Sequence, residues 1–309
     1  MEQKDLVHFM YMPLTGLGLY GGYRGDRWLK NRIHIFKQFV LPSLLNQTNK
    51  HFVLWVSLRY EERSSFIIQE FKEFLEGTGL KVVFTYDGVC FWDDKYPDEV
   101  ARERLITAIH ASIPELINVM GDAKHVLMTI QPSDDCYYDQ AVQEIQSTFW
   151  KVPDLQVFGY QYGFVMDYAT KEIRTWNPTT TPPFYTIKFP REIFIDPLKH
   201  VNYTGPYKSH EYVKDYLKAF YKPYRGFLVG THGENISTVF NHPFARPLDN
   251  LASPTFVMRI FGIEKVEPLK LKISWRKSLM RRLPHGWQKK IRYIFGERGY
   301  AKFYAWIRS

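Results

Sequence analysis

"HVLMTIQPSDDCYYDQAV", residues 125–142, places a short apolar run directly before two adjacent carboxylates, Asp134 and Asp135. The run over 125–130 predicts a buried strand, because nearly continuous apolar residues are typical of a strand covered on both faces. Ligands of parallel α/β sheets bind beyond the carboxyl ends of the strands. We therefore expect residues 132–135 to lie at the ligand-binding edge of a sheet.

Apolar runs and amphipathic segments alternate along the chain before this strand. The expected strands are residues 5–14, 51–58 and 80–88, and the expected helices are residues 27–44, 61–79 and 98–113. Pro42 is expected to kink or interrupt the first of these helices. The alternation of strand and helix predicts a parallel sheet wound with helices, so the expected fold class is α/β.

The second half of the sequence follows a less regular pattern. After a helix over 139–150, we expect a hairpin at 155–176, a proline-broken strand at 180–195 and an aromatic helix at 209–220. Irregular segments of this kind often carry binding residues on a more regular scaffold. We expect this half to shape the site of a second substrate.

The positive charge is concentrated at the end of the chain. The net charge is +9, and twelve of the 41 Lys and Arg residues but only one of the 32 acids fall within residues 270–309. Trp, Leu and Ile recur there at helical spacing, a pattern typical of helices that lie on an anionic membrane surface. The same pattern fits a helical subdomain that packs on the main domain and exposes its basic face.

Several classes of protein are disfavoured by the sequence. No run approaches the roughly 20 apolar residues that span a bilayer, and the N-terminus lacks the features of a signal peptide. We expect a cytoplasmic protein, soluble or peripheral on the inner face of a membrane. Cys90 and Cys136 are far apart and are expected to be reduced. Nucleic acid is not an expected partner, because residues 1–269 are slightly acidic and carry no known binding motif.

The paired carboxylates have two interpretations from residue type alone. Mg²⁺ and Mn²⁺ prefer oxygen ligands and are commonly held by one or two carboxylates together with the phosphates of a substrate. Asp134 or Asp135 could instead cap the helix that follows and interact favourably with its dipole. Both interpretations remain open at this point.

Two stretches resemble the signature segments of GT-A-fold glycosyltransferases. They are "FVLPSLLNQTNKHFVLWVSLR", residues 39–59, and the stretch over 125–142. More narrowly, residues 27–52 and "HGENIST", residues 232–238, are similar to the bacterial rhamnosyltransferase family. The resemblance implies a GT-A-like, mostly parallel sheet flanked by helices, and a glycosyltransferase that uses a nucleotide-sugar donor.

The resemblance also implies roles for the carboxylates. Asp134 and Asp135 match the last two acids of the family's D-x-D-D motif. Ser133 matches the variable position, and Pro132 stands where the first acid belongs. Ser133, Asp134 and Asp135 are therefore expected to bind the donor, and the two acids to hold a Mg²⁺ or Mn²⁺ ion. Because Pro132 replaces an acid, the need for a metal is left open.

Three further residues are implied to bind the donor. Arg59 follows the second strand, where family members often carry an Asp, and is expected near the nucleotide. Asp87 ends the third strand and is placed to hydrogen-bond a base. Arg104 resembles the basic residue that faces the pyrophosphate; the alternative is a pair with a neighbouring acid on its own helix.

Glycosyl transfer also needs a base that removes the proton of the acceptor hydroxyl. The resembling enzymes place this base in the second half of the chain, where His232 and Glu234 lie in a glycine-rich loop. Glu234 and Asn235 could instead cap a following helix, and His232 could be an ordinary surface residue. Glu211 and Asp215 are weaker candidates.

Residues 1–135 are thus expected to bind the donor, residues 136–265 to bind the acceptor within the same domain, and residues 266–309 to form a basic amphipathic segment. The expected reaction transfers a sugar, rhamnose by resemblance, to a glycan or lipid-linked acceptor with inversion. A non-catalytic relative that binds sugar or nucleotide is an alternative, as is a protein that binds nucleic acid through its tail. A glycosidase is disfavoured, because its two carboxylates face each other across a sugar.

Overall fold

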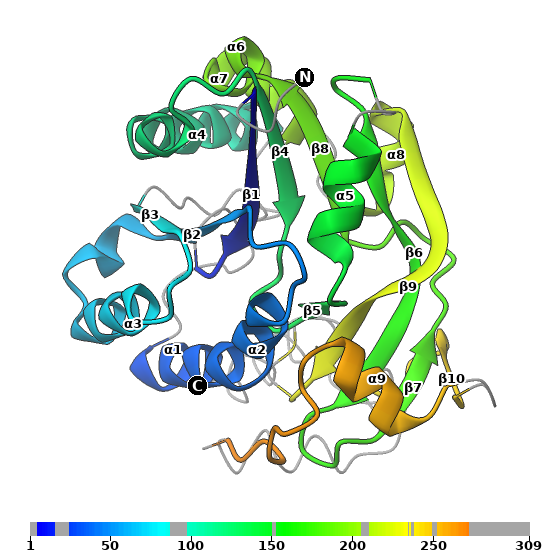
Figure 1. The fold of residues 1–309 in the computed structure, drawn as a ribbon. Helices are drawn as coiled ribbons and strands as arrows, with labels where there is room; N and C mark the ends of the chain where they lie inside the picture. Colours follow the sequence, from blue (N-terminus) through cyan, green and yellow to red (C-terminus); the bar gives the residue numbers. More distant parts are fainter. Residues whose placement is uncertain are drawn as a thin grey trace, which may run out of the picture.

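A computed structural model of the protein has an α/β fold in which helices flank a curled sheet (Figure 1). The structure describes residues 5–15, 25–86, 98–149, 153–204, 210–233, 235, 238–248 and 252–271. Over these ranges, no helix combines the length and the apolar character that crossing a membrane requires. The predicted α/β fold class is confirmed.

Four parallel strands form one side of the sheet in the order β3-β2-β1-β4. They are β1 (Leu6–Pro13), β2 (Val53–Leu58), β3 (Val82–Tyr86) and β4 (His125–Ile130). All six residues of β2 are buried, as expected for a strand covered on both faces. The predicted parallel arrangement of these strands is therefore confirmed.

The other side of the sheet is largely antiparallel. It continues from β4 through β8 (Tyr185–Pro190), β6 (Val157–Asp167), β7 (Ile173–Trp176) and β10 (Ala245–Arg246). The predicted hairpin is the antiparallel pair β6 and β7. A long strand, β9 (Ala219–Thr231), runs parallel to β6, and the short β5 (Cys136–Tyr137) pairs with β9.

Helices cover both faces of the parallel strands (Figure 1). One face carries α1 (Asp26–Ile35), the π-helical turn η2 (Phe36–Val40), α2 (Leu41–Leu45), the 3-10 turn η3 (Tyr60–Ser64) and α3 (Phe66–Glu76). The other carries α4 (Asp98–Met120). The remaining helices are α5 (Ala141–Phe149), α6 (Arg191–Phe194), α7 (Pro197–Thr204), η4 (His210–Tyr212), α8 (Val213–Tyr216) and α9 (Pro254–Ile260).

One helical prediction is confirmed and another is wrong. The run over 27–44 is interrupted beside Pro42, which lies in the first turn of α2 directly after the π-helical turn η2. The aromatic helix expected over 209–220 is reduced to η4 and the single turn α8, because the chain enters β9 at Ala219. Phe220 then stacks on Phe158 of β6, at 6.0 Å between ring centroids, so pairing with β6 replaces the local helix.

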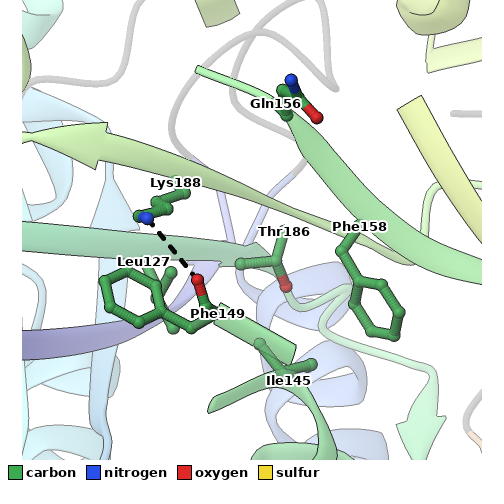
Figure 2. Close-up of a pocket in the computed structure, with 7 residues that line it drawn as sticks. All are labelled: Leu127, Ile145, Phe149, Gln156, Phe158, Thr186 and Lys188. Atoms are coloured by element: carbon green, nitrogen blue, oxygen red, sulfur yellow. Dashed lines mark hydrogen bonds between the residues drawn. The ribbon is translucent and has the colours of Figure 1, made fainter. Parts of the chain in front are cut away.

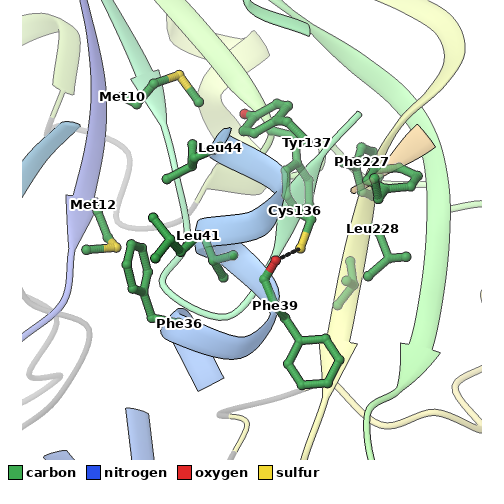
Figure 3. Close-up of a cluster of buried hydrophobic side chains, with 14 of the residues drawn as sticks. Met10, Met12, Phe36, Phe39, Leu41, Leu44, Cys136, Tyr137, Phe227 and Leu228 are labelled. Carbon is green, nitrogen blue, oxygen red and sulfur yellow. Dashed lines mark hydrogen bonds between the residues drawn. The ribbon is translucent and has the colours of Figure 1, made fainter. Parts of the chain in front are cut away.

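The largest apolar core joins the first helices to the strands from both halves of the chain (Figure 3). Met10 and Leu44 pack in the same cluster as Cys136, Tyr137 and Phe227, each of which is nearly or fully buried. The thiol of the reduced Cys136 donates to the carbonyl of Phe39 at 3.4 Å. This core fixes β5, and with it the carboxylates that immediately precede β5.

Candidate functional site

Asp134 and Asp135 lie in the turn between β4 and β5, at the carboxyl edge of the parallel strands. The side-chain amide of Gln131 closes this turn by donating to the carbonyls of Pro132 and Asp135, both at 2.8 Å. The Tyr137 hydroxyl donates back to the carbonyl of Ile130 at 2.8 Å. The predicted location of these residues at the carboxyl edge of the parallel strands is confirmed.

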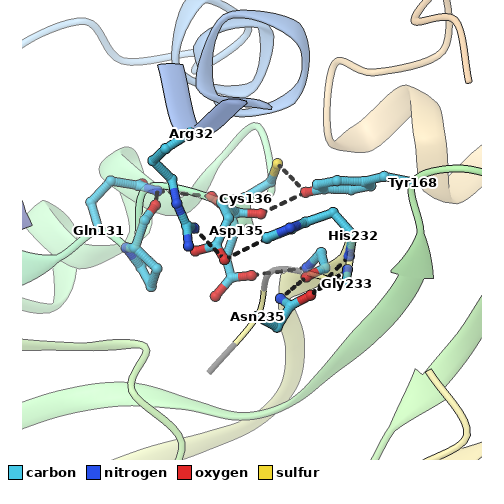
Figure 4. Close-up of polar contacts among 11 residues, drawn as sticks. Arg32, Gln131, Asp135, Cys136, Tyr168, His232, Gly233 and Asn235 are labelled. Carbon is cyan, nitrogen blue, oxygen red and sulfur yellow. Dashed lines mark hydrogen bonds and ion pairs between the residues drawn. The ribbon is translucent and has the colours of Figure 1, made fainter. Parts of the chain in front are cut away.

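The Asp134 carboxylate is the centre of a charged cluster with Arg32 and His232, whose side chains point toward each other (Figure 4). Its Oδ2 lies 2.5 Å from Nη1 of Arg32, which comes from α1 and is only 2% exposed. The same oxygen lies 3.0 Å from Nε2 of His232, which follows β9. The side chain of Asp134 itself is 16% exposed, so its carboxylate is the member of this trio nearest to solvent.

Asp135 has a different partner. Its Oδ1 accepts a hydrogen bond from the backbone N–H of Gly230 in β9, at 2.8 Å, and the residue is buried. The two adjacent acids therefore point to different elements. Neither of these contacts is the helix cap that the sequence left open as an alternative, because Asp134 engages side chains and Asp135 engages a strand.

The two acids also differ in charge. Burial raises the pKa of Asp134, but the charge of Arg32 and the hydrogen bond and charge of His232 outweigh it, so this pKa lies well below its usual range. Burial and the negative charge of Asp134 raise the pKa of Asp135 well above its usual range, against the hydrogen bond from Gly230. Asp134 thus stays ionised, whereas Asp135 holds a proton to higher pH.

Tyr168, which follows β6, packs beside the charged cluster and contacts both His232 and the backbone of Asp134. Its ring stacks on Phe39 with centroids 3.7 Å apart, and it lies nearly parallel to the His232 ring with centroids 6.5 Å apart. Its hydroxyl donates to the backbone carbonyl of Asp134 at 2.8 Å. The ring also passes so close to Gly230 that a Cβ there would overlap it. Gly230 is therefore required by close packing.

Asn235 fixes the loop that carries His232. Its side-chain oxygen accepts from the backbone N–H of His232 at 2.8 Å, and its amide donates to the carbonyl of Gly230 at 2.6 Å. Residues 238–240, which belong to the helix that Asn235 was suggested to cap, are not helical, so this suggestion is not supported. Glu234, the other predicted base, lies outside the described residues.

The remaining predicted donor residues are spread along the sheet edge and a helix. Ser133 is buried in the turn beside Asp134. Arg59 follows β2, where its backbone N–H donates to Thr15 Oγ1 at 3.2 Å and to Glu62 Oε2 at 3.1 Å. Arg104 is partly buried in the second turn of α4. Asp87 lies outside the described residues, as do Cys90 and nearly all of the basic tail.

The weaker base candidates lie elsewhere. Glu211 in η4 and Asp215 in α8 are both exposed to solvent. The cluster around Asp134 is instead completed by a residue of the loop after β9. His232 is thus the predicted base that the structure brings to the carboxylates.

Arg32 is the main site residue that sequence reasoning missed. It lies inside the stretch that carries the family resemblance, but no role was predicted for it. A usable signal was present, because Trp28, Arg32 and Ile35 share one helical face with the buried Phe39. The Arg32 guanidinium lies 5.3 Å from the centroid of the Trp28 ring. A charged residue within an apolar stripe indicates a buried partner.

Glu62 is a second buried acid at this edge. It accepts a hydrogen bond from the Thr15 hydroxyl as well as from the Arg59 N–H, and it is 3% exposed. Burial raises its pKa above the usual value, partly opposed by these two hydrogen bonds. Its contacts tie the end of β1 to the turn after β2.

The described residues do not fit the predicted Mg²⁺ or Mn²⁺ ion as they stand. Within the described ranges, no group of three or more His, Cys, Asp or Glu side chains is arranged to hold a metal ion. Asp134 Oδ2 is already shared by Arg32 and His232, and Asp135 Oδ1 is engaged by Gly230. A divalent ion at this pair would have to share Asp134 with a guanidinium.

A separate small pocket lies between α5 and the strands (Figure 2). Its walls are mainly apolar, and Lys188 is its charged member, with Nζ at 3.5 Å from the carbonyl of Phe149. The lining residues are Leu127, Ile145, Phe149, Gln156, Phe158, Thr186 and Lys188. None of them is a predicted site residue, so this pocket is distinct from the carboxylate cluster.

The family comparison falls on the first part of this site. Residues 23–63 match the model of a family described as "Putative rhamnosyl transferase". Because of this match, we term residues 23–63 the rhamnosyltransferase-type segment. It runs from α1 to η3 and includes Arg32 and Arg59. The predicted resemblance to that family is confirmed over these residues. No curated protein matches the sequence.

Two solved structures are similar in part. Mouse xyloside xylosyltransferase 1 in its apo form has 15% sequence identity and a TM-score of 0.29, over 51% of this chain and 52% of the other. S. aureus TarS in complex with UDP has 11% identity and a TM-score of 0.31, over 74% of this chain and 61% of the other. The chain thus spans between 52% and 61% of the length of these two structures.

Proposed function

We propose that this protein is a glycosyltransferase that moves a sugar, rhamnose by family resemblance, from a nucleoside diphosphate to a hydroxyl of a glycan or lipid-linked acceptor. The configuration at the anomeric carbon of the sugar would be inverted in a single in-line displacement. In this proposal, residues 1–135 mainly bind the donor and residues 136–265 mainly bind the acceptor. His232 and Asp134 would lie where the two halves meet.

One observation supports the proposal above the others. Arg32 belongs to the rhamnosyltransferase-type segment and contacts the carboxylate of Asp134, which lies about a hundred residues later at the carboxyl edge of the sheet. A segment matched by sequence is thereby tied to a charged cluster at the position where α/β folds bind ligands. A purely structural ion pair would not require this location.

The chemistry of the leaving group fits this cluster. A departing nucleoside diphosphate carries negative charge, which preorganised cations and N–H donors stabilise. Arg32 supplies a guanidinium whose planar donors suit phosphate oxygens. Arg59 and Arg104 are proposed to contact the nucleotide and the pyrophosphate, as the resemblance implies. Asp87 is proposed to bind the base of the nucleotide.

His232 is our candidate for the base that accepts the proton of the acceptor hydroxyl. Its ring lies against Asp134, whose carboxylate would stabilise the imidazolium that forms when the proton is accepted. The side chain is fully buried, so the ring must gain access to the acceptor when substrates bind. Glu234, its neighbour in sequence, is the second candidate.

The basic segment 270–309 is proposed to hold the enzyme at an anionic membrane surface on the cytoplasmic side, where lipid-linked acceptors would be reached. Co-sedimentation with vesicles that contain phosphatidylglycerol, at physiological salt, tests this. Pelleting of the full chain with these vesicles, but not with neutral ones, is expected. Equal recovery in the supernatant with both would contradict the membrane proposal and leave the catalytic one standing.

The enzyme proposal is tested by donor hydrolysis across a panel of nucleotide sugars, each with EDTA, Mg²⁺ or Mn²⁺. Turnover of at least one donor, lost in the Asp134→Asn variant, is expected. The panel also tests the predicted divalent ion directly. Thermal stabilisation by a nucleotide sugar without turnover would favour the non-catalytic alternative. No turnover and no thermal shift with any donor or nucleoside diphosphate would contradict the proposal.

A further inference from the structure

We propose that Arg32 is a built-in cation of the carboxylate site, so that the site binds a nucleoside diphosphate without a divalent metal ion. This inference rests on the proposed function, because it concerns how the same site binds its donor. It goes beyond it in assigning Arg32 the place that a metal would take beside Asp134. The family resemblance alone points the other way, toward Mg²⁺ or Mn²⁺.

The first argument is the position of the guanidinium. Nη1 of Arg32 lies 2.5 Å from Asp134 Oδ2, which places a positive charge directly beside the carboxylate. A divalent ion bound to the same oxygen would stand within a few ångströms of that charge, and the two cations would repel each other strongly in so buried a place. The Asp134 carboxylate can therefore pair closely with the Arg32 guanidinium or with a divalent ion, but not with both.

The second argument is the cost of burying an arginine. Arg32 is only 2% exposed, and removing a charge from water costs several kcal/mol unless close partners compensate it. Asp134 and the Trp28 ring provide such partners. An arginine that merely neutralised an acid could lie on the surface at little cost. Here the guanidinium is carried on a packed helix and held at the edge where ligands bind.

The third argument is the set of oxygens left for a metal. Pro132 occupies the position of the first acid of the motif and offers no side-chain ligand. Asp134 Oδ2 is shared by two nitrogen groups, and Asp135 Oδ1 is bonded to Gly230 of β9. Mg²⁺ demands near-octahedral oxygen coordination, and Mn²⁺ also favours oxygen ligands. With one oxygen of each carboxylate engaged and no acid at position 132, this turn offers fewer free oxygen ligands than such an ion prefers, whereas Asp134 already pairs with Arg32.

The charge balance favours a diphosphate once Arg32 is counted. Two ionised carboxylates alone would repel the donor. Arg32 compensates the charge of Asp134, and a backbone N–H faces the carboxylate of Asp135. The guanidinium thus offsets one of the two negative charges of this turn. This part of the repulsion is removed without a metal ion.

The test compares wild-type protein with Arg32→Gln and Arg32→Lys, and uses Arg27→Gln as a matched control, because Arg27 is an exposed arginine on the same helix. Two quantities are measured on the full chain. One is the affinity for UDP, GDP, TDP and ADP by calorimetry, in EDTA and in Mn²⁺. The other is the affinity for Mn²⁺ alone, from the electron paramagnetic resonance signal of the free ion. Circular dichroism checks that each variant is folded.

We expect wild type to bind a nucleoside diphosphate with the same affinity in EDTA and in Mn²⁺, within about twofold. The affinity of Arg32→Gln for the diphosphate should fall about 30-fold or more in EDTA and recover in part with Mn²⁺. This variant should also bind Mn²⁺ alone at least 10-fold more tightly than wild type, because the Asp134 carboxylate is freed of the guanidinium. Arg32→Lys should fall between, and Arg27→Gln should match wild type.

The inference is overturned if wild type binds Mn²⁺ as tightly as Arg32→Gln does, or binds the diphosphate only when Mn²⁺ is present. If Arg32→Gln is poorly folded, Arg32→Lys replaces it in the comparison of Mn²⁺ affinities. The dependence of diphosphate binding on Mn²⁺ is measured on wild type and needs no variant. Failure of the proposed function is a different result: no nucleoside diphosphate binds under either condition. The titration with Mn²⁺ alone tests whether Arg32 opposes metal binding, and it needs no nucleotide.

Discussion

This protein contains two buried polar clusters whose charges differ. The site cluster consists of Arg32, Asp134, Asp135 and His232. The second, which we term the sheet polar chain, consists of Gln146, His8, Thr129 and Thr186. It runs from Gln146 Nε2 to His8 Nδ1 (3.2 Å), from His8 Nε2 to Thr129 Oγ1 (2.7 Å), and from there to Thr186 Oγ1 (2.6 Å).

The sheet polar chain is neutral. Burial lowers the pKa of His8 to about 3, so its ring is uncharged at physiological pH, and its two nitrogens each have a neighbour. Such a network links α5 to three strands and needs no ligand. The site cluster keeps its charges, and its two acids have pKa values displaced in opposite directions. The comparison suggests that retained, unequal charge distinguishes a candidate site from a structural network.

Making the site cluster neutral should have the largest effect. Asp134→Asn keeps the shape but removes the charge that holds Arg32 and His232. We expect turnover of the donor to fall by about 100-fold or more, as when a preorganised polar group is removed from an active site. Steady-state kinetics measure this, with Asp196→Asn on the exposed start of α7 as the control. Equal losses in both variants would show that the cluster has no special role.

Disturbing the packing behind the site cluster should cost stability as well. A Cβ at Gly230 would overlap the Tyr168 ring, whose hydroxyl holds the backbone of Asp134. We expect Gly230→Ala to lower the free energy of unfolding by about 2 to 3 kcal/mol. Gly77→Ala is the matched control, since a Cβ there meets only ordinary contacts at the end of α3. The free energies of unfolding of both variants are measured by urea unfolding. Similar losses in the two variants would contradict the close packing at Gly230.

Acidification should act on the sheet polar chain. His8 has a pKa of about 3 when folded and 6.5 as its reference value, so between these pH values the unfolded chain binds a proton that the folded chain does not. The contribution of His8 should therefore lower stability by about 1.4 kcal/mol for each pH unit below 6.5. His200, whose burial lowers its pKa to about 4, adds a similar slope.

Unfolding measured from pH 7 to pH 5 tests this, with His8→Gln as the variant. The slope of stability against pH should become smaller in His8→Gln. The slope that remains should reflect the other buried groups with displaced pKa values, among them His200, His210 and Asp135. An unchanged slope would mean that His8 is not a buried neutral histidine.

The smallest effect is expected when one hydroxyl is removed from the sheet polar chain. Thr129→Val keeps the shape but leaves His8 and Thr186 without their shared neighbour. We expect a loss of about 1 to 2 kcal/mol in stability and a turnover within twofold of wild type. Thr107→Val, on the exposed face of α4, is the control and should change neither quantity. A large loss of turnover in Thr129→Val would remove the distinction between the two clusters.

The first half of the fold was predictable because its signals are local. The run over 125–130 and the helix over 61–79 bury their own apolar faces, and periodicity reveals such faces. The second half depends on pairing between distant strands. Residues 219 and 220 were assigned to a helix from local spacing, but β9 pairs with β6, about sixty residues earlier. Local patterns do not contain that information.

The site was predictable only in part for the same reason. Asp134 and His232 were found because strand ends and glycine-rich loops are visible in sequence. Their contact, and the arrival of Arg32 from α1, arise from tertiary packing. The Tyr168 ring that limits Gly230 also comes from another strand. The role of a residue such as Arg32, whose partner lies far along the chain, could not be predicted from one segment of sequence.

Hydrogen exchange tests the central claim most directly, by locating the donor on the full chain. Wild-type protein is compared in EDTA with and without a saturating nucleoside diphosphate, chosen as the one among UDP, GDP, TDP and ADP that binds. We predict that protection appears in peptides over residues 25–40, 130–138 and 226–233, which meet at the site cluster, and not over α7. Protection confined to other parts of the chain, or absent from these three peptides, would contradict the account.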